Sequence, residues 1–200
     1  YDAFKRKETF ATSGPRIKVR FFSGYDFKDT KINDLDLVKK AYEDNLSMGS
    51  TISIEQAKEP KFLVWAFADP LGAPLQRIQI IKGWMENGEH QERVYDVACS
   101  DGLIVNSSTY RCPENGAKVN IENCSIKENS GASELKTFWQ DPDFLMEQRA
   151  FYYVRVLENP VCRWSTWDSI REGVEPRSDI PSTIQERAWT SPIWFEPTNS

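Results

Sequence analysis

Histidine is almost missing from this chain, because His90 is the only one among its 200 residues. A metal centre that activates water for ester hydrolysis needs several clustered histidines and carboxylates, so these residues predict neither metal ligands nor catalytic residues. Basic runs are missing too, and the net charge of −5 disfavours nucleic acid as a partner. No apolar run approaches the roughly 20 residues of a membrane span, so no span is expected.

Aromatic and apolar residues, in contrast, are plentiful. The chain is 12% aromatic and 40% hydrophobic and holds seven tryptophans, which argues against disorder and suffices for one substantial core. The chain begins at Tyr1 and not at Met. We interpret it as the back part of a longer polypeptide, and a processed mature protein is the alternative.

Four cysteines are present, at positions 99, 112, 124 and 162. An even set in a loop-rich stretch is typical of disulfides in an exported protein, so we predict at least one disulfide in the region of Cys99, Cys112 and Cys124. The absence of a Cys-x-x-Cys pair disfavours a zinc site. Free buried thiols remain an alternative, and the sequence does not choose among the three possible pairings.

Period-two alternation of apolar residues dominates the chain and predicts strands. Ile17, Val19 and Phe21 share one face of a strand over 16–22, and Asn87-Gly88 is a strong signal for a tight hairpin. The run over 62–67 is apolar on both faces, as in a central strand, and Asp69 to Gly72 forms a turn after it. Further strands are expected over 76–82, 93–98, 118–121, 149–157 and 193–195.

One helix of note is expected, over residues 34–46. Asp34 can cap it, and Leu35, Val38 and Tyr42 recur at helical spacing. Residues 134–139 fit a helical turn. Short strands, the hairpin and the lack of strand–helix–strand alternation predict a mainly β, antiparallel β-sandwich-like domain.

The segment from Thr9 to Arg16 is the strongest candidate for ligand contact. Thr12 and Ser13 precede a Gly-Pro turn that can expose backbone N–H groups, and Arg16 offers a planar fork that fits phosphate or sulfate. Thr12, Ser13 and Arg16 are therefore the predicted substrate-binding residues. The alternative is a plain turn that leads into the next strand.

Three other features favour structural interpretations. His90 follows the Asn-Gly turn and fits a solvated hairpin position. Asp141-Pro-Asp143 fits a surface turn better than a calcium site, which needs more oxygen ligands. Trp164 and Trp167 fit a core cluster with a paired Arg and Asp better than an exposed carbohydrate platform.

Several longer segments resemble one family in their order along the chain. They are Lys7-Glu-Thr-Phe-Ala-Thr-Ser-Gly-Pro-Arg-Ile17, Leu63-Val-Trp-Ala66, Arg77-Ile-Gln-Ile-Ile-Lys-Gly-Trp84, Val94-Tyr-Asp-Val97, Arg163-Trp-Ser-Thr-Trp-Asp168 and Thr190-Ser-Pro-Ile-Trp-Phe195. Together with the strand over 149–157 they resemble the C-terminal portion of the family known as domain of unknown function 3604 (DUF3604). That family itself resembles the PHP (polymerase and histidinol phosphatase) metal-dependent hydrolases.

The resemblance implies an exported, periplasmic or secreted hydrolase that acts on a small anionic ester, phosphate- or sulfate-like. It implies an upstream barrel that holds a divalent metal, zinc or manganese. Residues 1–22 would be the tail end of that barrel, and residues 23–200 a β-rich domain that buttresses its site. The family's His-x-His and Asp-x-His motifs have no counterpart here, and Met48-Gly-Ser-Thr51 stands where a Met-Gly-Gly-Asp type loop is expected. The alternative function is a non-catalytic β-sandwich that binds a glycan or a protein partner.

Overall fold

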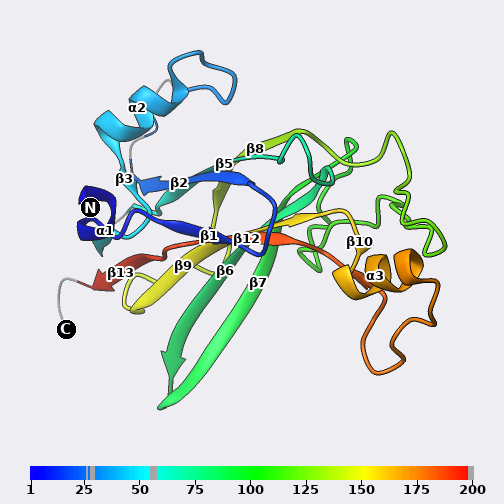
Figure 1. The fold of residues 1–200 in the computed structure, drawn as a ribbon. Coiled ribbons are helices and arrows are strands. Elements are labelled where there is room, and N and C mark those ends of the chain that lie inside the picture. The colour runs from blue at the N-terminus through cyan, green and yellow to red at the C-terminus, as the bar shows by residue number, and fades with distance from the viewer. Residues whose placement is uncertain (26, 28–29, 55–57, 198–200) are drawn as a thin grey trace.

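The computed structural model describes residues 1–25, 27, 30–54 and 58–197. Two β-sheets face each other across one apolar core, and short helices lie outside them (Figure 1). The mainly β, antiparallel sandwich predicted from the sequence is confirmed. In the described residues, no helix has both the length and the apolar character needed to cross a membrane.

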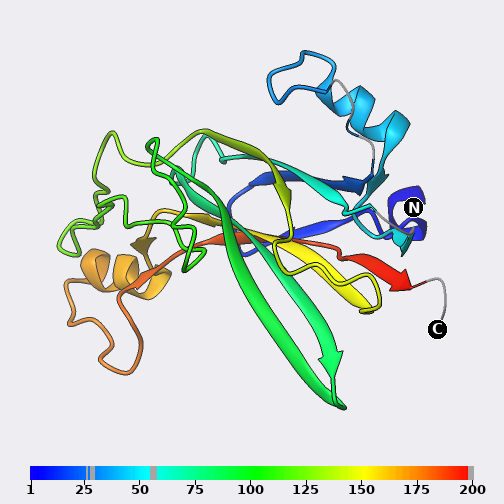
Figure 2. The same ribbon diagram turned by 180° about the vertical axis from the view of Figure 1, so that it is seen from behind.

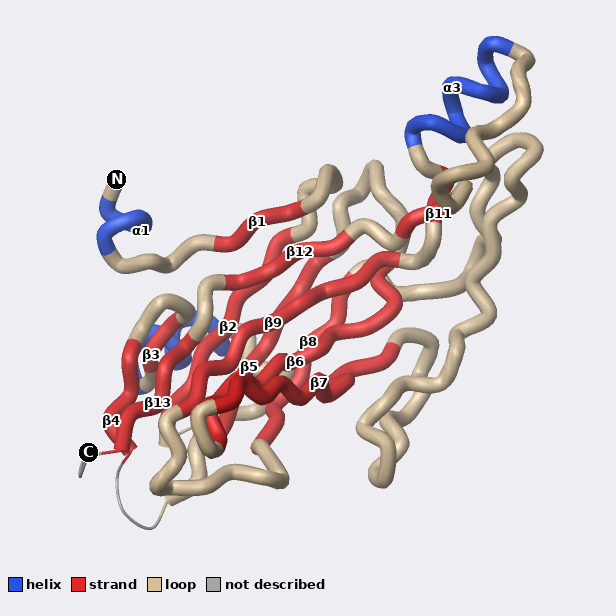
Figure 3. The backbone as a smooth tube through the Cα atoms, turned by 90° about the horizontal axis from the view of Figure 1, so that it is seen from below, coloured by secondary structure: helices blue, strands red, loops and turns tan. Residues whose placement is uncertain are grey.

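The larger sheet is organised around β9 (Ala150–Glu158). One edge of β9 pairs with β6, and the other pairs with β12 and then β13, so Figure 3 shows β1, β12 and β9 side by side. All these pairs are antiparallel, whereas β13 and β4 run parallel. The remaining strands are β1 (Phe10–Thr12), β4 (Thr51–Ile54), β6 (Leu75–Glu86), β7 (Glu89–Cys99), β12 (Arg187–Thr190) and β13 (Ile193–Pro197).

The smaller sheet has the strand order β3-β2-β5-β8. Its strands are β2 (Lys18–Gly24), β3 (Leu46–Ser47), β5 (Lys61–Phe67) and β8 (Glu134–Gln140). The central position expected for residues 62–67 is confirmed, because β5 lies between β2 and β8. The helical turn predicted at 134–139 is wrong, since all seven residues of β8 pair with β5 and its Leu135 and Trp139 pack on the core.

The core fills the space between the two sheets. Ile17, Val19 and Phe21 are buried on one face, as their alternation predicts. The Phe62 ring from the smaller sheet lies 4.7 Å from Tyr152 of the larger sheet, centroid to centroid. Burial of rings from both sheets stabilises the sandwich, since apolar area removed from water contributes about 25 cal/mol per Å².

Helix α2 (Leu37–Asp44) covers part of the outer face of the smaller sheet. A helix was predicted over 34–46, but its buried face was predicted wrongly. Leu37 and Ala41 are buried against Phe22, whereas Leu35 is fully exposed. Leu35 lies before the first helical residue, and the buried face carries Leu37 and Ala41, with only the Tyr42 ring of the expected repeat in contact with Phe22, at 4.8 Å between centroids.

The cap of α2 also differs from the prediction. The Asp34 carboxylate accepts hydrogen bonds from the Lys31 backbone N–H and from Lys40 Nζ, both at 3.0 Å. The residue at the helix N-cap is Asp36, and its side chain makes no capping bond. Asp34 therefore fixes the loop before the helix and binds Lys40 within it, but it is not the N-cap.

The long β6–β7 hairpin projects from the body of the molecule (Figures 1 and 2). Its turn is at Asn87-Gly88, as predicted, with φ of 51° and 82° at the two positions. Both values lie in the left-handed region that a type I′ turn requires. His90 is exposed next to this turn, as expected.

The loops between residues 100 and 133 lie with α3 (Trp164–Glu172) at the end opposite the two termini (Figures 1 and 2). Disulfides join Cys99 to Cys112 and Cys124 to Cys162, which confirms the predicted crosslink in this region. The strand expected over 118–121 is reduced to a single bridge between Val119 and Ile126. At the same end as α3, β10 (Val161–Cys162) and β11 (Thr183–Ile184) form a small antiparallel pair. Helix α1 (Asp2–Lys5) lies at the opposite end, with the N-terminus.

Helix α3 was not predicted, and it corrects the interpretation of the tryptophans. Trp164 is 74% exposed and Trp167 36% exposed, so neither is a core residue. Helical spacing instead turns Thr166 and Ser169 inward, where the Thr166 hydroxyl donates to the Ser182 carbonyl at 2.8 Å. The expected pair of Arg163 and Asp168 is not formed, because Asp168 lies 3.7 Å from Arg171 within the helix and the buried Arg163 Nε has no hydrogen-bond partner among the described residues.

Candidate functional site

The predicted substrate-binding segment connects the two sheets. Thr12 ends β1 and pairs with Ala188, and the chain then turns into β2. The Ser13 hydroxyl donates to the Glu186 carboxylate and accepts a hydrogen bond from the Arg187 N–H at 2.9 Å. The boundary predicted between residues 22 and 23 falls inside β2. The residues before it form β1 in the larger sheet and most of β2 in the smaller sheet.

Arg16 is exposed at the end of this turn. Its backbone N–H donates to Asp69 Oδ2 at 2.7 Å, which fixes the backbone beside the Asp69–Gly72 turn. The structure therefore brings Ser13 and Arg16 close to carboxylates of their own chain. The negative charge of Asp69 and Glu186 opposes an anion at this turn, and the guanidinium of Arg16 favours one.

A third carboxyl group, that of Glu158, is buried near the same turn. Burial raises the pKa of Glu158 to about 7, and the neighbouring charges of Asp69 and Glu186 add to the rise. Its Oε1 atom has no hydrogen-bond partner in the described part of the chain. The carboxyl of Glu158 therefore exchanges its proton near neutral pH.

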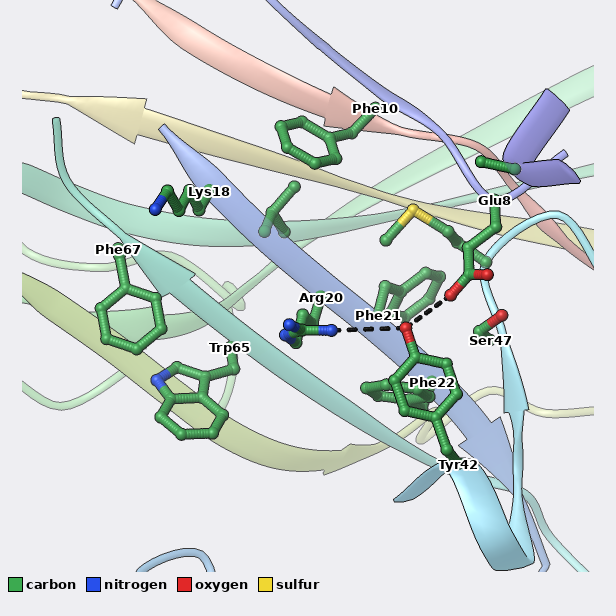
Figure 4. A pocket seen from close by; sticks show the side chains of 13 residues that line it. Glu8, Phe10, Lys18, Arg20, Phe21, Phe22, Tyr42, Ser47, Trp65 and Phe67 are labelled. Atoms are coloured by element: carbon green, nitrogen blue, oxygen red, sulfur yellow. Dashed lines mark hydrogen bonds between the residues drawn. The ribbon is translucent and has the colours of Figure 1, made fainter. Parts of the chain in front are cut away.

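A pocket of about 460 Å³ opens at the edge of the sandwich, between the N-terminal segment and β2 (Figure 4). Between Lys18 and Phe21, β2 pairs with β5 on one side and with no strand of the described residues on the other. The pocket therefore lies where the two sheets are not closed over each other. Its lining residues are Ala3, Glu8, Phe10, Lys18, Val19, Arg20, Phe21, Phe22, Tyr42, Ser47, Met48, Trp65 and Phe67.

A chain of polar contacts forms one wall of the pocket. The Tyr42 hydroxyl donates to Glu8 Oε1 at 2.6 Å and accepts from Arg20 Nη1 at 3.3 Å (Figure 4). Burial alone would raise the pKa of Glu8, but hydrogen bonds from Tyr42 and Arg6 outweigh it and lower that pKa. Glu8 is thus an anion that its neighbours already neutralise, and it ties the N-terminal segment to α2.

Aromatic rings and cations form another part of the pocket. Strand register places Lys18 opposite Phe67 and Arg20 opposite Trp65 on the outer face of the smaller sheet. Lys136 Nζ lies 5.1 Å from the centroid of the Trp65 ring. Neither Lys18 nor Arg20 forms an ion pair with a carboxylate of the described residues. Sequence reasoning missed this site, although Lys18 and Arg20 alternate with the core residues of the predicted strand.

The N-terminal segment beside the pocket exposes large apolar side chains. Tyr1 is 89% exposed, Phe4 77% and Phe10 44%. Neighbouring exposed aromatic side chains of this kind are typical of a surface that another part of a protein covers.

A second polar cluster is buried in the sandwich. Lys82 Nζ donates to Asp141 Oδ2 at 2.8 Å and to the Asp143 carbonyl at 2.7 Å, and the Tyr152 hydroxyl donates to Asp141 Oδ2 at 2.6 Å. The turn predicted at Asp141-Pro-Asp143 is present, with the Phe144 N–H bonded to the Asp141 carbonyl at 3.3 Å, but the Asp141 side chain is fully buried instead of exposed. Burial and the charge of Asp141 raise the pKa of Tyr152 strongly. Each group has a partner, which is typical of a structural network.

The outer face of the larger sheet carries a row of aromatic residues. Phe151 pairs with Trp194 across β9 and β13, with ring centroids 4.9 Å apart, and Tyr153 follows it on the same face. A Cβ atom at Gly83 would lie 2.3 Å from the Phe151 ring, so this glycine lets the ring lie flat on the sheet. Trp189 is on the same face in β12. The period-two pattern of residues 149–157 already indicates that Phe151 and Tyr153 share one face of the strand.

Among the described residues, no group of three or more His, Cys, Asp or Glu side chains is arranged to hold a metal ion. Fold and surface together define a disulfide-linked β-sandwich with an open aromatic and cationic pocket. The family model described as "Protein of unknown function (DUF3604)" matches residues 1–197, so the chain belongs to that family. No curated protein and no solved structure matches the chain.

Proposed function

We propose that this chain is the C-terminal β portion of an exported, metal-dependent hydrolase that resembles PHP phosphoesterases. The whole enzyme acts on a phosphate- or sulfate-like ester. A barrel upstream of Tyr1 holds a divalent metal, zinc or manganese, and activates water there. The sandwich buttresses that barrel and carries out no chemistry by itself.

The surface of the N-terminal segment is the observation that carries the proposal. Tyr1, Phe4 and Phe10, all within the first ten residues, expose their aromatic rings. A preceding barrel that packs there would remove this apolar area from water and hold the two parts in fixed orientation. Membership of the DUF3604 family, with its resemblance to the PHP hydrolases, supports the same assignment.

The disulfides support export. Cys99–Cys112 and Cys124–Cys162 crosslink the region that is richest in loops. Such bonds form and persist in the periplasm or outside the cell, where the milieu is oxidising. A periplasmic or secreted location therefore belongs to the proposal.

Arg16, with Thr12 and Ser13, is proposed to contact the anionic group of the substrate at the mouth of the barrel. The exposed guanidinium and the backbone N–H fixed by Asp69 support a defined position for this cation. Arg16→Lys keeps the charge but loses the bidentate fork, so it should lower kcat/KM of the whole enzyme without loss of folding. Arg177→Lys, at an exposed position, is the matched control. Equal kcat/KM for Arg16→Ala and the wild type would show that Arg16 does not contact the substrate.

The experiment that tests the proposal compares two proteins. The natural polypeptide that carries this chain is assayed with 4-nitrophenyl phosphate and 4-nitrophenyl sulfate in the presence of zinc or manganese, beside residues 1–200 alone. We expect turnover by the longer protein that a chelator abolishes, and none by residues 1–200. Turnover by residues 1–200 that is lost in His90→Ala, or upstream residues without a His-x-His motif and without turnover, would overturn the proposal.

A second candidate function is glycan binding without catalysis. The row of Phe151, Tyr153, Trp189 and Trp194 favours it, because sugars stack on aromatic faces that are flanked by polar groups. Affinity electrophoresis in gels that contain soluble polysaccharides tests it. Retardation by a polysaccharide that Trp194→Ala abolishes, and that Trp164→Ala leaves unchanged, would support this function. Unchanged mobility in every gel would remove it.

A further inference from the structure

We infer that the pocket between the N-terminal segment and β2 binds a small, planar aromatic anion, such as an aryl sulfonate, sulfate or carboxylate. This inference rests on the pocket alone and does not depend on the proposed hydrolase. The volume of about 460 Å³ falls within the range of about 300–1,000 Å³ that is usual for small-molecule sites.

Charge defines the polar part of the ligand. Lys18 and Arg20 line the pocket and lack an ion pair in the described part of the chain. The carboxylate in the lining, Glu8, is already bonded by Arg6 at 3.0 Å and by Tyr42 at 2.6 Å. The pocket therefore presents net positive charge, and an anionic group is the complement. The fork of Arg20 can hold two oxygens of a sulfonate or carboxylate at once.

The rings define the apolar part. Phe10, Trp65 and Phe67 line the same pocket, and Figure 4 shows them around Lys18 and Arg20. A planar ring placed among them gains stacking and buried area, which an inorganic anion cannot supply. The mixture of cations and rings thus favours an aromatic body that carries one negative group.

The closed end of the pocket favours a small ligand over a polypeptide. The free edge of β2 between Lys18 and Phe21 could in principle pair with an added strand. However, the hydrogen bond from Tyr42 to Glu8 joins α2 to the N-terminal segment at one end of the pocket (Figure 4). An extended chain would have to break this contact to pass, whereas a ligand of one or two rings fits beside it.

The test is an NMR titration of residues 1–200, with amide shifts followed for each residue. The probe is 2-naphthalenesulfonate, compared with neutral 2-naphthalenemethanol, inorganic sulfate and an acidic hexapeptide of alternating Asp and Val. We expect a Kd on the order of 0.1–1 mM for the sulfonate, with shifts centred on residues 18–22 and 65–67. The neutral analogue and sulfate should each bind at least about tenfold more weakly, because the first lacks the anionic group and the second lacks the aromatic ring.

Variants locate the site. Arg20→Gln and Lys18→Gln should each weaken the sulfonate about tenfold, and Trp65→Leu should weaken it as well. The matched controls are the exposed cations Arg177→Gln and Lys39→Gln, which lie outside the lining. The inference would be overturned if the control variants lost as much affinity, or if the amide shifts were centred on other residues. It would also be overturned if the neutral analogue or sulfate bound as tightly as the sulfonate, or if the peptide alone bound.

Discussion

Cations lie beside aromatic rings in several places, and two of these places, the core and the open edge of β2, differ in what neutralises the charge. In the core, Lys82 lies 5.4 Å from the Trp84 ring centroid and 2.8 Å from the Asp141 carboxylate, and both charged groups are buried. At the open edge, Lys18 and Arg20 lie beside Trp65 and Phe67 without a carboxylate partner in the described residues.

This difference separates structure from function. A buried charge with a complete set of partners stabilises the fold only as a unit, because loss of one partner leaves the other uncompensated. A cation at a solvent-accessible pocket has no such constraint and can exchange water for a ligand.

Asp141→Asn should have the largest effect. It removes the negative charge that pairs with buried Lys82 and weakens the acceptor of the Tyr152 hydroxyl. We expect the free energy of unfolding to fall by about 3–5 kcal/mol, measured by urea denaturation. The control is Asp179→Asn, which breaks an exposed ion pair with Arg177 and should leave stability nearly unchanged. Equal stability of the wild type and Asp141→Asn would mean that the pair is not a structural unit.

Glu158→Gln should change how stability depends on pH. The pKa of Glu158 is raised by burial to about 7 from an ordinary value of 4.5. The folded state therefore binds the proton more tightly, so the contribution of Glu158 is most favourable at low pH and is lost as pH rises through about 7. Glutamine does not titrate, so the stability of the variant relative to wild type should increase by about 2–3 kcal/mol between pH 5 and pH 8.

Denaturation curves at several pH values measure this difference. Glu147→Gln, which removes an exposed carboxyl group, is the control and should show no comparable trend. If the difference in unfolding free energy between Glu158→Gln and the wild type stays constant from pH 5 to pH 8, the raised pKa of Glu158 is contradicted.

Gly88→Val should have the smallest effect. Gly88 has a φ of 82°, which a β-branched residue resists, so the hairpin should lose about 1–2 kcal/mol of stability. Gly14→Val is the control, because a Cβ atom there meets nothing within 4 Å and no left-handed φ is needed. Thermal unfolding compares the two variants, and equal Tm values would argue against strain at Gly88.

The sequence predicted those parts of the fold that rest on local patterns. The alternation of apolar residues correctly predicted that Ile17, Val19 and Phe21 are buried. The Asn87-Gly88 pair, which tolerates positive φ, correctly predicted the hairpin turn. It missed β8, because apolar residues on both faces of that strand obscure the period, and its pairing partner β5 is remote in sequence. Trp164 was misplaced since hydrophobicity alone does not say which face of a short helix is covered.

The candidate pocket could not be predicted from the sequence. Its residues come from the N-terminal segment, β2, α2 and β5, and only strand register and the position of α2 bring them together. Thr12, Ser13 and Arg16 stay a prediction, made from residues that lie close together in the sequence. Their carboxylate neighbours Asp69 and Glu186 come from distant segments and became visible only in the fold.

One paired measurement tests the comparison most directly. Lys82→Met and Lys18→Met each remove a cation that lies near an aromatic ring, and both variants are measured for unfolding free energy and for 2-naphthalenesulfonate affinity. We expect Lys82→Met to lose about 3–5 kcal/mol of stability, because Asp141 is left buried without its partner. Lys18→Met should keep wild-type stability and bind the sulfonate about tenfold more weakly. Wild-type affinity in Lys18→Met, or a loss of stability equal to that of Lys82→Met, would contradict the account.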